Sequence, residues 1–195
     1  MHLTNCICLL FSGQFETILT YPIRGKNKTK EKKMKYKKNH LLTQAAMIAA
    51  LYVVLTFLAN AFGLANYAVQ IRFSEALTIL PAFTAAGIPG LFIGCLISNI
   101  LTGCALPDII FGSLATLTGA IGTRMFRKYK WLTPLPPIAA NAVIVPFVLK
   151  YAYGIQPLWL SFVTVTIGEI LSCGILGMIL YFTLDKYKVH LFKTI

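Results

Sequence analysis

Residues 41–71, LLTQAAMIAALYVVLTFLANAFGLANYAVQI, decide the fold, because this stretch contains no charged side chain. A second uncharged stretch covers residues 76–107, and positions 41–184 together hold only nine Asp, Glu, Lys or Arg residues. Apolar runs of about 18 residues or more are typical of membrane-spanning helices, since a helix pairs its own backbone groups where lipid offers no partner. The sequence therefore predicts an integral membrane protein and disfavours a soluble enzyme.

The composition leaves room for one helical domain and little else. The chain has 195 residues, 57% hydrophobic and 12% charged. At ~20 residues per span this allows about six membrane helices with short loops, and glycine and proline clusters separate them. We predict an all-α bundle of about six transmembrane helices, near residues 41–62, 67–83, 88–102, 108–126, 131–150 and 157–184. The third is the shortest, so five spans remain an alternative.

Lys and Arg residues set the expected orientation in the membrane. With a cytoplasmic N-terminus, the inner side collects nine basic residues between positions 24 and 38, four between 124 and 130, and three after Asp185. The outer loops then hold only Lys150, while Arg72 lies within the second span. Cytoplasmic loops carry an excess of Lys and Arg, so both termini are predicted to be cytoplasmic in the cell membrane. The same bias explains the net charge of +12 without nucleic-acid binding.

Residues 1–33 do not fit this plan. Their apolar run from Cys6 to Phe11 is too short to span a bilayer, and no basic region precedes it as in a secretory signal. The codons for Lys30-Glu31 can spell a bacterial ribosome-binding sequence upstream of Met34. We expect residues 1–33 to be a misassigned leader or a disordered basic extension, and residues 34–195 to form the six-helix domain.

The sequence carries no motif for catalysis, a metal or a cofactor. The five cysteines have no C-x-x-C spacing, and all three histidines fall outside the expected spans. A nucleotide-binding G-x-x-x-x-G-K-[ST] loop and an H-E-x-x-H helix are both missing. We therefore expect no cofactor, no metal and no ATP hydrolysis by this chain. A membrane hydrolase using Glu75 or Asp108 is a minor alternative, as is a protein that only packs helices.

Polar side chains inside the expected spans are the candidate binding residues. An ionisable group at membrane depth costs roughly 2.5–3.5 kcal/mol on insertion scales, which makes such groups functional candidates. In the orientation above, four of them fall in the outer third of the membrane, namely Arg72, Glu75, Asn99 and Asp108. Asn141 and Glu169 lie near its midplane. This distribution predicts a polar cavity that opens outward. The full set is Gln70, Arg72, Ser74, Glu75, Asn99, Asp108, Asn141 and Glu169.

Structural roles remain open for several of these residues. Arg72 and Glu75 are spaced for an ion pair within one helix. Asp108 begins a helix and can cap it, and the two asparagines can simply bridge helices. Glu169 has no basic residue nearby on its own helix, so it needs a partner from another helix, a ligand or a proton.

Small residues recur at four-residue spacing near the inner end of the first expected helix. The two overlapping pairs are Ala45/Ala49 and Ala46/Ala50. Such residues let helix backbones approach closely. Internal packing is the default interpretation, and docking of a partner within the membrane is the alternative.

Three segments resemble the QueT family: QIRFSEALTILPAF at 70–83, IPGLFIGCLISNILTG at 88–103 and DIIFGSLATLTGA at 108–120. The likeness extends from about Met34 to the C-terminus. Members of this family are substrate-binding S components of energy-coupling-factor (ECF) transporters, proposed to import queuosine precursors. The resemblance implies a six-helix subunit that captures its substrate outside and pairs with a transmembrane T subunit and two ATPases. Its alanine face on the first helix would contact the T subunit.

The candidate site suits a 7-deazaguanine base. A guanine edge offers two adjacent donors to a carboxylate, and its carbonyl needs a donor such as Arg or Asn. An aminomethyl precursor adds a cation for a second carboxylate, and Trp159 or a tyrosine can stack on the ring. Another vitamin or small heterocycle is the alternative substrate. The predicted substrate-binding residues are Arg72, Glu75, Asn99, Asp108, Asn141, Glu169 and Trp159.

Overall fold

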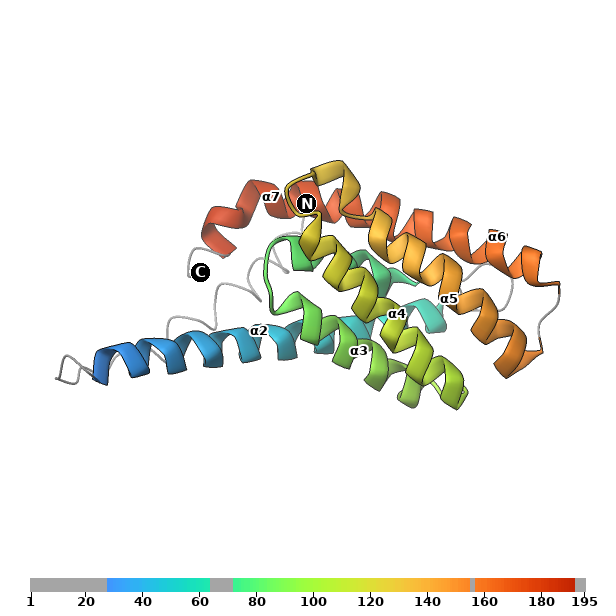
Figure 1. Ribbon diagram of the computed structural model, residues 1–195, viewed down its shortest axis with the longest axis horizontal. Coiled ribbons are helices and arrows are strands. Elements are labelled where there is room, and N and C mark those ends of the chain that lie inside the picture. Colours follow the sequence, from blue (N-terminus) through green and yellow to red (C-terminus); the bar gives the residue numbers. More distant parts are fainter. Residues whose placement is uncertain (1–27, 64–71, 155–156, 192–195) are drawn as a thin grey trace.

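The computed structural model describes residues 28–63, 72–154 and 157–191, and within these residues the protein is helical and has no strand (Figure 1). The predicted all-α membrane bundle is confirmed. The predicted leader lies mostly outside the described residues, and Met34 falls within the first described helix. The helices are α2 (Lys28–Ala61), η1 (Phe73–Ala82), α3 (Gly87–Leu101), α4 (Leu106–Met125), η2 (Lys130–Leu132), α5 (Leu135–Tyr153), α6 (Leu158–Glu169), η3 (Ile170–Leu176) and α7 (Gly177–Leu191).

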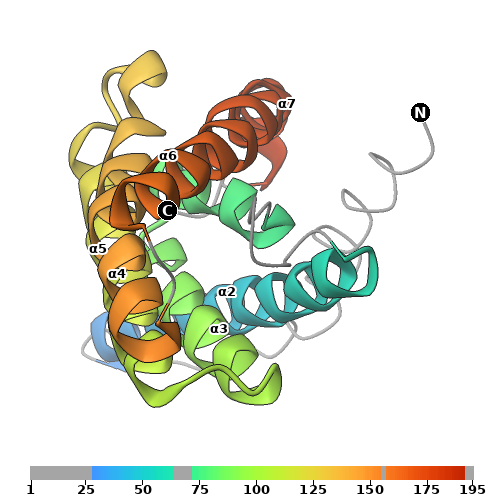
Figure 2. The ribbon, with the colours of Figure 1, turned by 90° about the vertical axis from the view of Figure 1, so that its right-hand side faces the viewer.

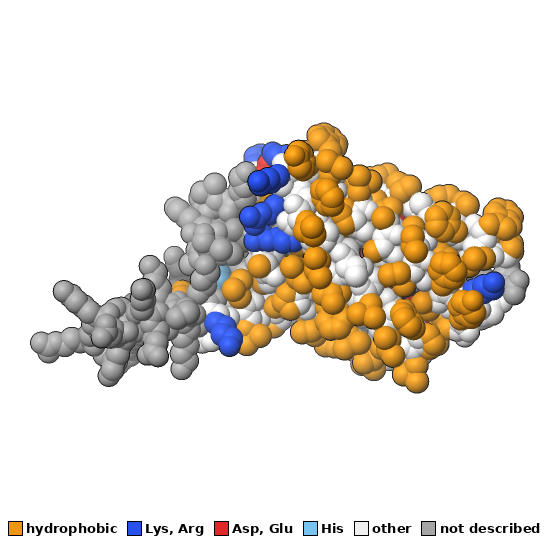
Figure 3. All heavy atoms as spheres, in the orientation of Figure 1, with side chains coloured by type: hydrophobic (Ala, Val, Ile, Leu, Met, Phe, Trp, Pro, Cys, Tyr) orange, Lys and Arg blue, Asp and Glu red, His pale blue; other side chains and the backbone are white. Residues whose placement is uncertain are grey.

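Four helical segments are long and apolar enough to cross a membrane: Lys38–Ala61, Leu106–Met125, Lys130–Tyr153 and Leu158–Tyr187. The apolar helix α3 is shorter, with 15 residues. Hydrophobic side chains cover the body of the molecule on the face drawn in Figure 3, while most of the basic side chains gather at one end. An apolar outer surface of this kind suits lipid rather than water.

The second expected span needs correction. Residues 67–71 lie outside the described residues, and the rest forms η1, a 3-10 helix of ten residues. At ~2.0 Å of rise per residue such a helix is about 20 Å long, less than the ~30 Å of a bilayer core. It packs against α2, α3, α4, α7 and η3, which surround it in the end view (Figure 2). Its apolar side chains are therefore buried in protein rather than exposed to lipid.

Helices α2 and α3 pack closely because small residues face each other. A Cβ atom at Gly90 would lie 2.8 Å from the carbonyl oxygen of Ala45, and one at Gly94 would lie 2.8 Å from Cβ of Tyr52. The face of α2 that bears Ala49 is buried in this contact. Close backbone approach of this kind is what small-residue patterns provide in membrane bundles.

The last span is continuous but not uniform. Helix α6 ends at Glu169, the π-helical segment η3 follows, and α7 continues from Gly177. A π-helical turn changes the direction of the side chains that follow it and is frequent at functional sites. Here it brings Cys173 next to Glu169 in the middle of the bundle.

Candidate functional site

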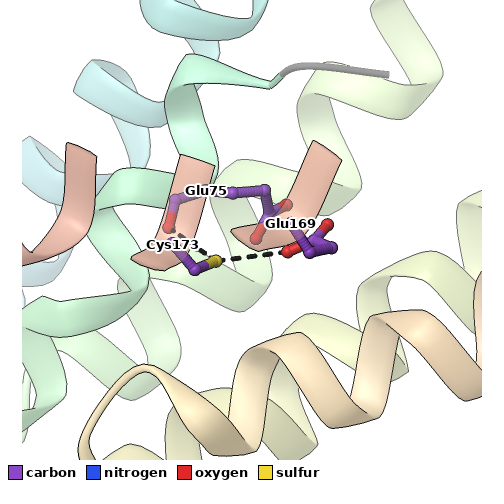
Figure 4. Close-up of side chains that lie close together, drawn as sticks. All are labelled: Glu75, Glu169 and Cys173. Carbon is purple, nitrogen blue, oxygen red and sulfur yellow. Dashed lines mark hydrogen bonds between the residues drawn. The ribbon is translucent and has the colours of Figure 1, made fainter. Parts of the chain in front are cut away.

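A buried polar cluster lies where η1 meets the π-helical segment. Glu75 of η1, Glu169 at the end of α6 and Cys173 of η3 each place a side-chain ligand atom within 4.8 Å of the other two. Figure 4 shows the Glu75 side chain extending toward Glu169, with Cys173 beside both. Two regions far apart in the sequence, η1 and the junction of α6 with η3, thus meet at one point.

Glu75 is the most enclosed acid of this cluster, with 1% of its surface exposed. Its Oε1 accepts a hydrogen bond of 2.5 Å from the hydroxyl of Tyr52 on α2. Its Oε2 is buried and accepts no hydrogen bond from the described residues, although Asn141 lies close enough to interact with this carboxyl group. A buried acceptor left without a donor costs about 1–3 kcal/mol, and more if it is charged. Glu75 therefore has an acceptor position available for a ligand that donates.

Glu169 is 7% exposed and has two neutral partners. Asn141 on α5 donates to its Oε1 through Nδ2 at 3.0 Å. The thiol of Cys173 shares its single proton between Oε2 of Glu169 at 3.2 Å and the backbone oxygen of Glu75 at 3.4 Å. The sequence predicted that Glu169 would need a partner from elsewhere, and Asn141 is such a partner from another helix. No described Lys, Arg or His forms an ion pair with it.

Arg72 precedes η1 and is partly buried. The ion pair with Glu75 that the spacing allowed is not formed, since no Arg72–Glu75 contact falls within ion-pair distance. The guanidinium still interacts electrostatically with Asp108 and Glu75. It is the basic group that faces these acids within the described part of the chain. A donor that is not fixed by a carboxylate is available for a carbonyl of a ligand.

Asp108 and Asn99 form a second polar group between α3 and α4. Asp108 lies in the first turn of α4, and its Oδ2 accepts a hydrogen bond of 3.2 Å from Tyr153. The helix is capped by Ala105 without a side-chain bond, so Asp108 is not the N-cap residue that was the alternative. Asn99 Nδ2 contacts the backbone oxygen of Asp108 at 3.5 Å. Asn99 therefore bridges α3 and α4, which is the structural role that the sequence left open for it.

The predicted site residues therefore divide into three groups. Glu75, Asn141 and Glu169 meet in the central cluster. Asp108 and Asn99 contact each other between α3 and α4, and Arg72 interacts electrostatically with Asp108 and Glu75. Trp159, in the first turn of α6, is 67% exposed, and no described contact joins it to either group. Gln70 lies outside the described residues. Sequence reasoning missed Tyr52 and Cys173, because a tyrosine or a lone cysteine within an apolar run carries no distinctive signal.

The alanine pairs of α2 also divide. Ala45 and Ala49 are 6% and 8% exposed and pack against α3, whereas Ala46 and Ala50 lie on the surface. The partner-binding face stays a prediction, and its first pair is buried in the internal contact with α3. Ala46 and Ala50 keep the exposure that a partner would require.

These features define an integral membrane protein with a polar site enclosed by helices. Polar groups buried within a membrane bundle are typical of proteins that bind substrates or ions there. The QueT transporter family matches residues 42–186, and the chain belongs to this family. The queuosine precursor transporter QueT of Lactococcus lactis subsp. cremoris (strain MG1363) is 35% identical over 98 residues, which are 50% of this chain and 57% of the relative. The matched part thus spans little more than half of that curated relative. No solved structure matches this chain.

Proposed function

We propose that this chain is the substrate-binding membrane subunit of an ECF-type importer for queuosine precursors, which are 7-deazaguanine bases. The subunit binds its substrate from outside the cell, and ATP hydrolysis in partner subunits drives translocation. The observation that carries this proposal is the buried cluster of Tyr52, Glu75, Asn141 and Glu169 inside an otherwise apolar bundle. The printed name of the Lactococcus relative supports the choice of substrate.

The side chains of the site complement a guanine-like edge. Such an edge presents adjacent N–H donors, for which buried carboxylates are the matching acceptors, and a carbonyl, for which Arg72 is a matching donor. Charged hydrogen bonds of this kind contribute about 1.5–3 kcal/mol each. The unpartnered Oε2 of Glu75 gives the site an acceptor that the protein itself does not use.

The energy for transport comes from a transmembrane T subunit and two ATPases. The exposed alanines of α2, Ala46 and Ala50, are the proposed contact with the T subunit, since they permit close approach of a second helix. The chain itself is a binding subunit rather than an enzyme, and it needs no cofactor.

The proposed orientation places both termini in the cytoplasm. Lys130, after α4, forms an ion pair of 2.9 Å with Asp185 of α7, so two of the basic segments lie at the same end of the bundle. Lys150 is in the last turn of α5, at the other end of that helix. The positive-inside rule assigns the end with more Lys and Arg to the cytoplasm.

Growth rescue tests the transport function. A bacterial strain that cannot make queuosine precursors is supplied with a 7-deazaguanine base, with and without this chain and the ECF partner subunits, and queuosine in its tRNA is measured. Incorporation should require the chain, the partners and intact ATPase sites. Incorporation that is independent of this chain would contradict the proposal.

A further inference from the structure

The central cluster and the Asp108 group, which Arg72 links electrostatically, together contain an excess of negative groups. Glu75 and Glu169 point toward each other from η1 and α6, and Asp108 is a third buried acid on α4. Arg72 is the basic group that acts on them within the described residues. If every group is ionised, three carboxylates face one guanidinium. A low-dielectric site does not hold such an excess, which is relieved either by protons on the carboxyl groups or by a compensating cation.

The polar partners of the acid pair are all neutral. Tyr52 donates to Glu75, while Asn141 and Cys173 donate to Glu169. These bonds use one oxygen of Glu75 and both oxygens of Glu169, and they leave Oε2 of Glu75 buried without a donor among the residues that the structure describes. Figure 4 shows that this carboxylate is directed at Glu169 rather than away from it. The Glu75 carboxylate, which carries the open acceptor, therefore lies beside a second carboxylate, and two adjacent carboxylates are a favourable place for a cation.

The donor pattern suits an organic ammonium better than a metal ion. The thiol of Cys173 serves Glu169 as a neutral donor, so the cluster offers carboxylate oxygens to a ligand rather than a thiolate. An ammonium group carries three N–H donors and can bond to two carboxylates at once. Charge-assisted bonds of this type are roughly twice as strong as neutral ones.

We propose that Glu75 and Glu169 together bind a protonated amine of the ligand, so that the subunit selects amine-bearing 7-deazaguanine bases over neutral ones. This inference rests on the proposed function, because it assigns one part of the same substrate to the acid pair. The ring edge is then left to the Arg72, Asn99 and Asp108 side of the site. One ligand cation reduces the charge excess and satisfies the open acceptor of Glu75.

The test compares two bases of nearly equal size. Purified full-length protein in detergent is titrated with 7-aminomethyl-7-deazaguanine, which is a cation at neutral pH, and with 7-methyl-7-deazaguanine, which is not. The amine should bind roughly 10- to 100-fold more tightly, the factor that corresponds to a charged hydrogen bond. Because this comparison uses only the wild-type protein, its result does not depend on whether a variant folds.

Two variants locate the amine. In Glu75→Gln and in Glu169→Gln the preference for the amine should fall to a few-fold or less. Asp108→Asn removes the same charge from a buried acid outside the pair, and it should keep the preference whatever its overall affinity. Helicity and thermal unfolding in detergent show that each variant is folded.

The outcomes separate this inference from the proposed function. Equal binding of the two bases by the wild-type protein would overturn the amine site and leave the proposed function standing. An undiminished preference in both Gln variants would also overturn it. So would an equal loss of affinity for the two bases in these variants, because the acid pair would then bind the ring edge rather than the amine. Binding of neither base would reject the proposed function, and the amine site with it.

Discussion

At the scale of single residues, Glu75 explains why the bundle has a polar centre. Its side chain is buried, one oxygen is bound to Tyr52, and the other has no donor. Stability alone would not favour this arrangement, because an apolar or amide side chain of similar size would avoid the desolvation of an acid. A ligand-binding site is expected to contain groups that lower the stability of the ligand-free protein.

Glu75→Gln should therefore stabilise the ligand-free protein while weakening ligand binding. The amide oxygen can still accept from Tyr52, and the amide nitrogen can donate toward Glu169 in place of the missing ligand donor. We expect a gain of about 1–3 kcal/mol in the free energy of unfolding, the size of the penalty for an unsatisfied buried acceptor. Thermal unfolding in detergent, with and without base, measures both effects. A loss of stability in the empty protein would show that the carboxylate is needed for folding.

Tyr52→Phe tests the hydrogen bond that the same carboxylate accepts from Tyr52. The change removes the hydroxyl that donates to Oε1, which is the one side-chain hydrogen bond to Glu75 recorded within the described part of the chain. The empty protein should lose about 1–3 kcal/mol of stability, since the ring remains but the acid is less satisfied. In the Glu75→Gln background the same substitution should be less costly, because a neutral amide is easier to leave unpaired. Equal losses in the two backgrounds would mean that Tyr52 and Glu75 are not coupled.

At the scale of elements, the two alanine pairs of α2 should behave differently. Ala49→Leu inserts three carbon atoms into the contact with α3, where Gly94 already leaves no space for a methyl group. We expect it to lower the free energy of unfolding by about 1–3 kcal/mol, the usual range for overpacking. Thermal unfolding of the purified protein measures this loss.

Ala50→Leu is the matched control, because the same enlargement occurs one position away on the exposed side of α2. It should leave stability and base binding unchanged and should reduce co-purification with the T subunit and its ATPases. If Ala50→Leu leaves the complex intact while Ala49→Leu breaks it, the exposed pair does not contact the partner.

The sequence predicted some elements well and others poorly for physical reasons. Helix η1 was expected to be a span because hydropathy measures the avoidance of water and does not distinguish burial in lipid from burial in protein. The Ala45/Ala49 and Ala46/Ala50 pairs have the same spacing, so only the packing of α3 shows which pair is internal. Glu75, Asn141 and Glu169 were found because acids and amides in apolar spans are conspicuous. Tyr52 was missed because a tyrosine is common in apolar spans and does not stand out there.

At the scale of the whole molecule, the proposed orientation predicts which basic residues are accessible from outside the cell. A single cysteine is introduced as Lys150→Cys or as Lys128→Cys in a background whose native cysteines are replaced by serine, and intact cells are treated with a membrane-impermeant maleimide. The cysteine at 150 should be labelled, and the one at 128 should react only after the cells are lysed. The reverse pattern would place both termini outside.

The central claim is that the buried acid cluster binds a 7-deazaguanine base, and equilibrium titration of the purified full-length protein tests it most directly. The wild-type protein should bind 7-aminomethyl-7-deazaguanine saturably, and Glu169→Gln should bind it more weakly by about 1.5–3 kcal/mol, the range for hydrogen bonds to a charged group. Absence of binding by folded wild-type protein, or equal affinity in Glu169→Gln, would contradict the claim.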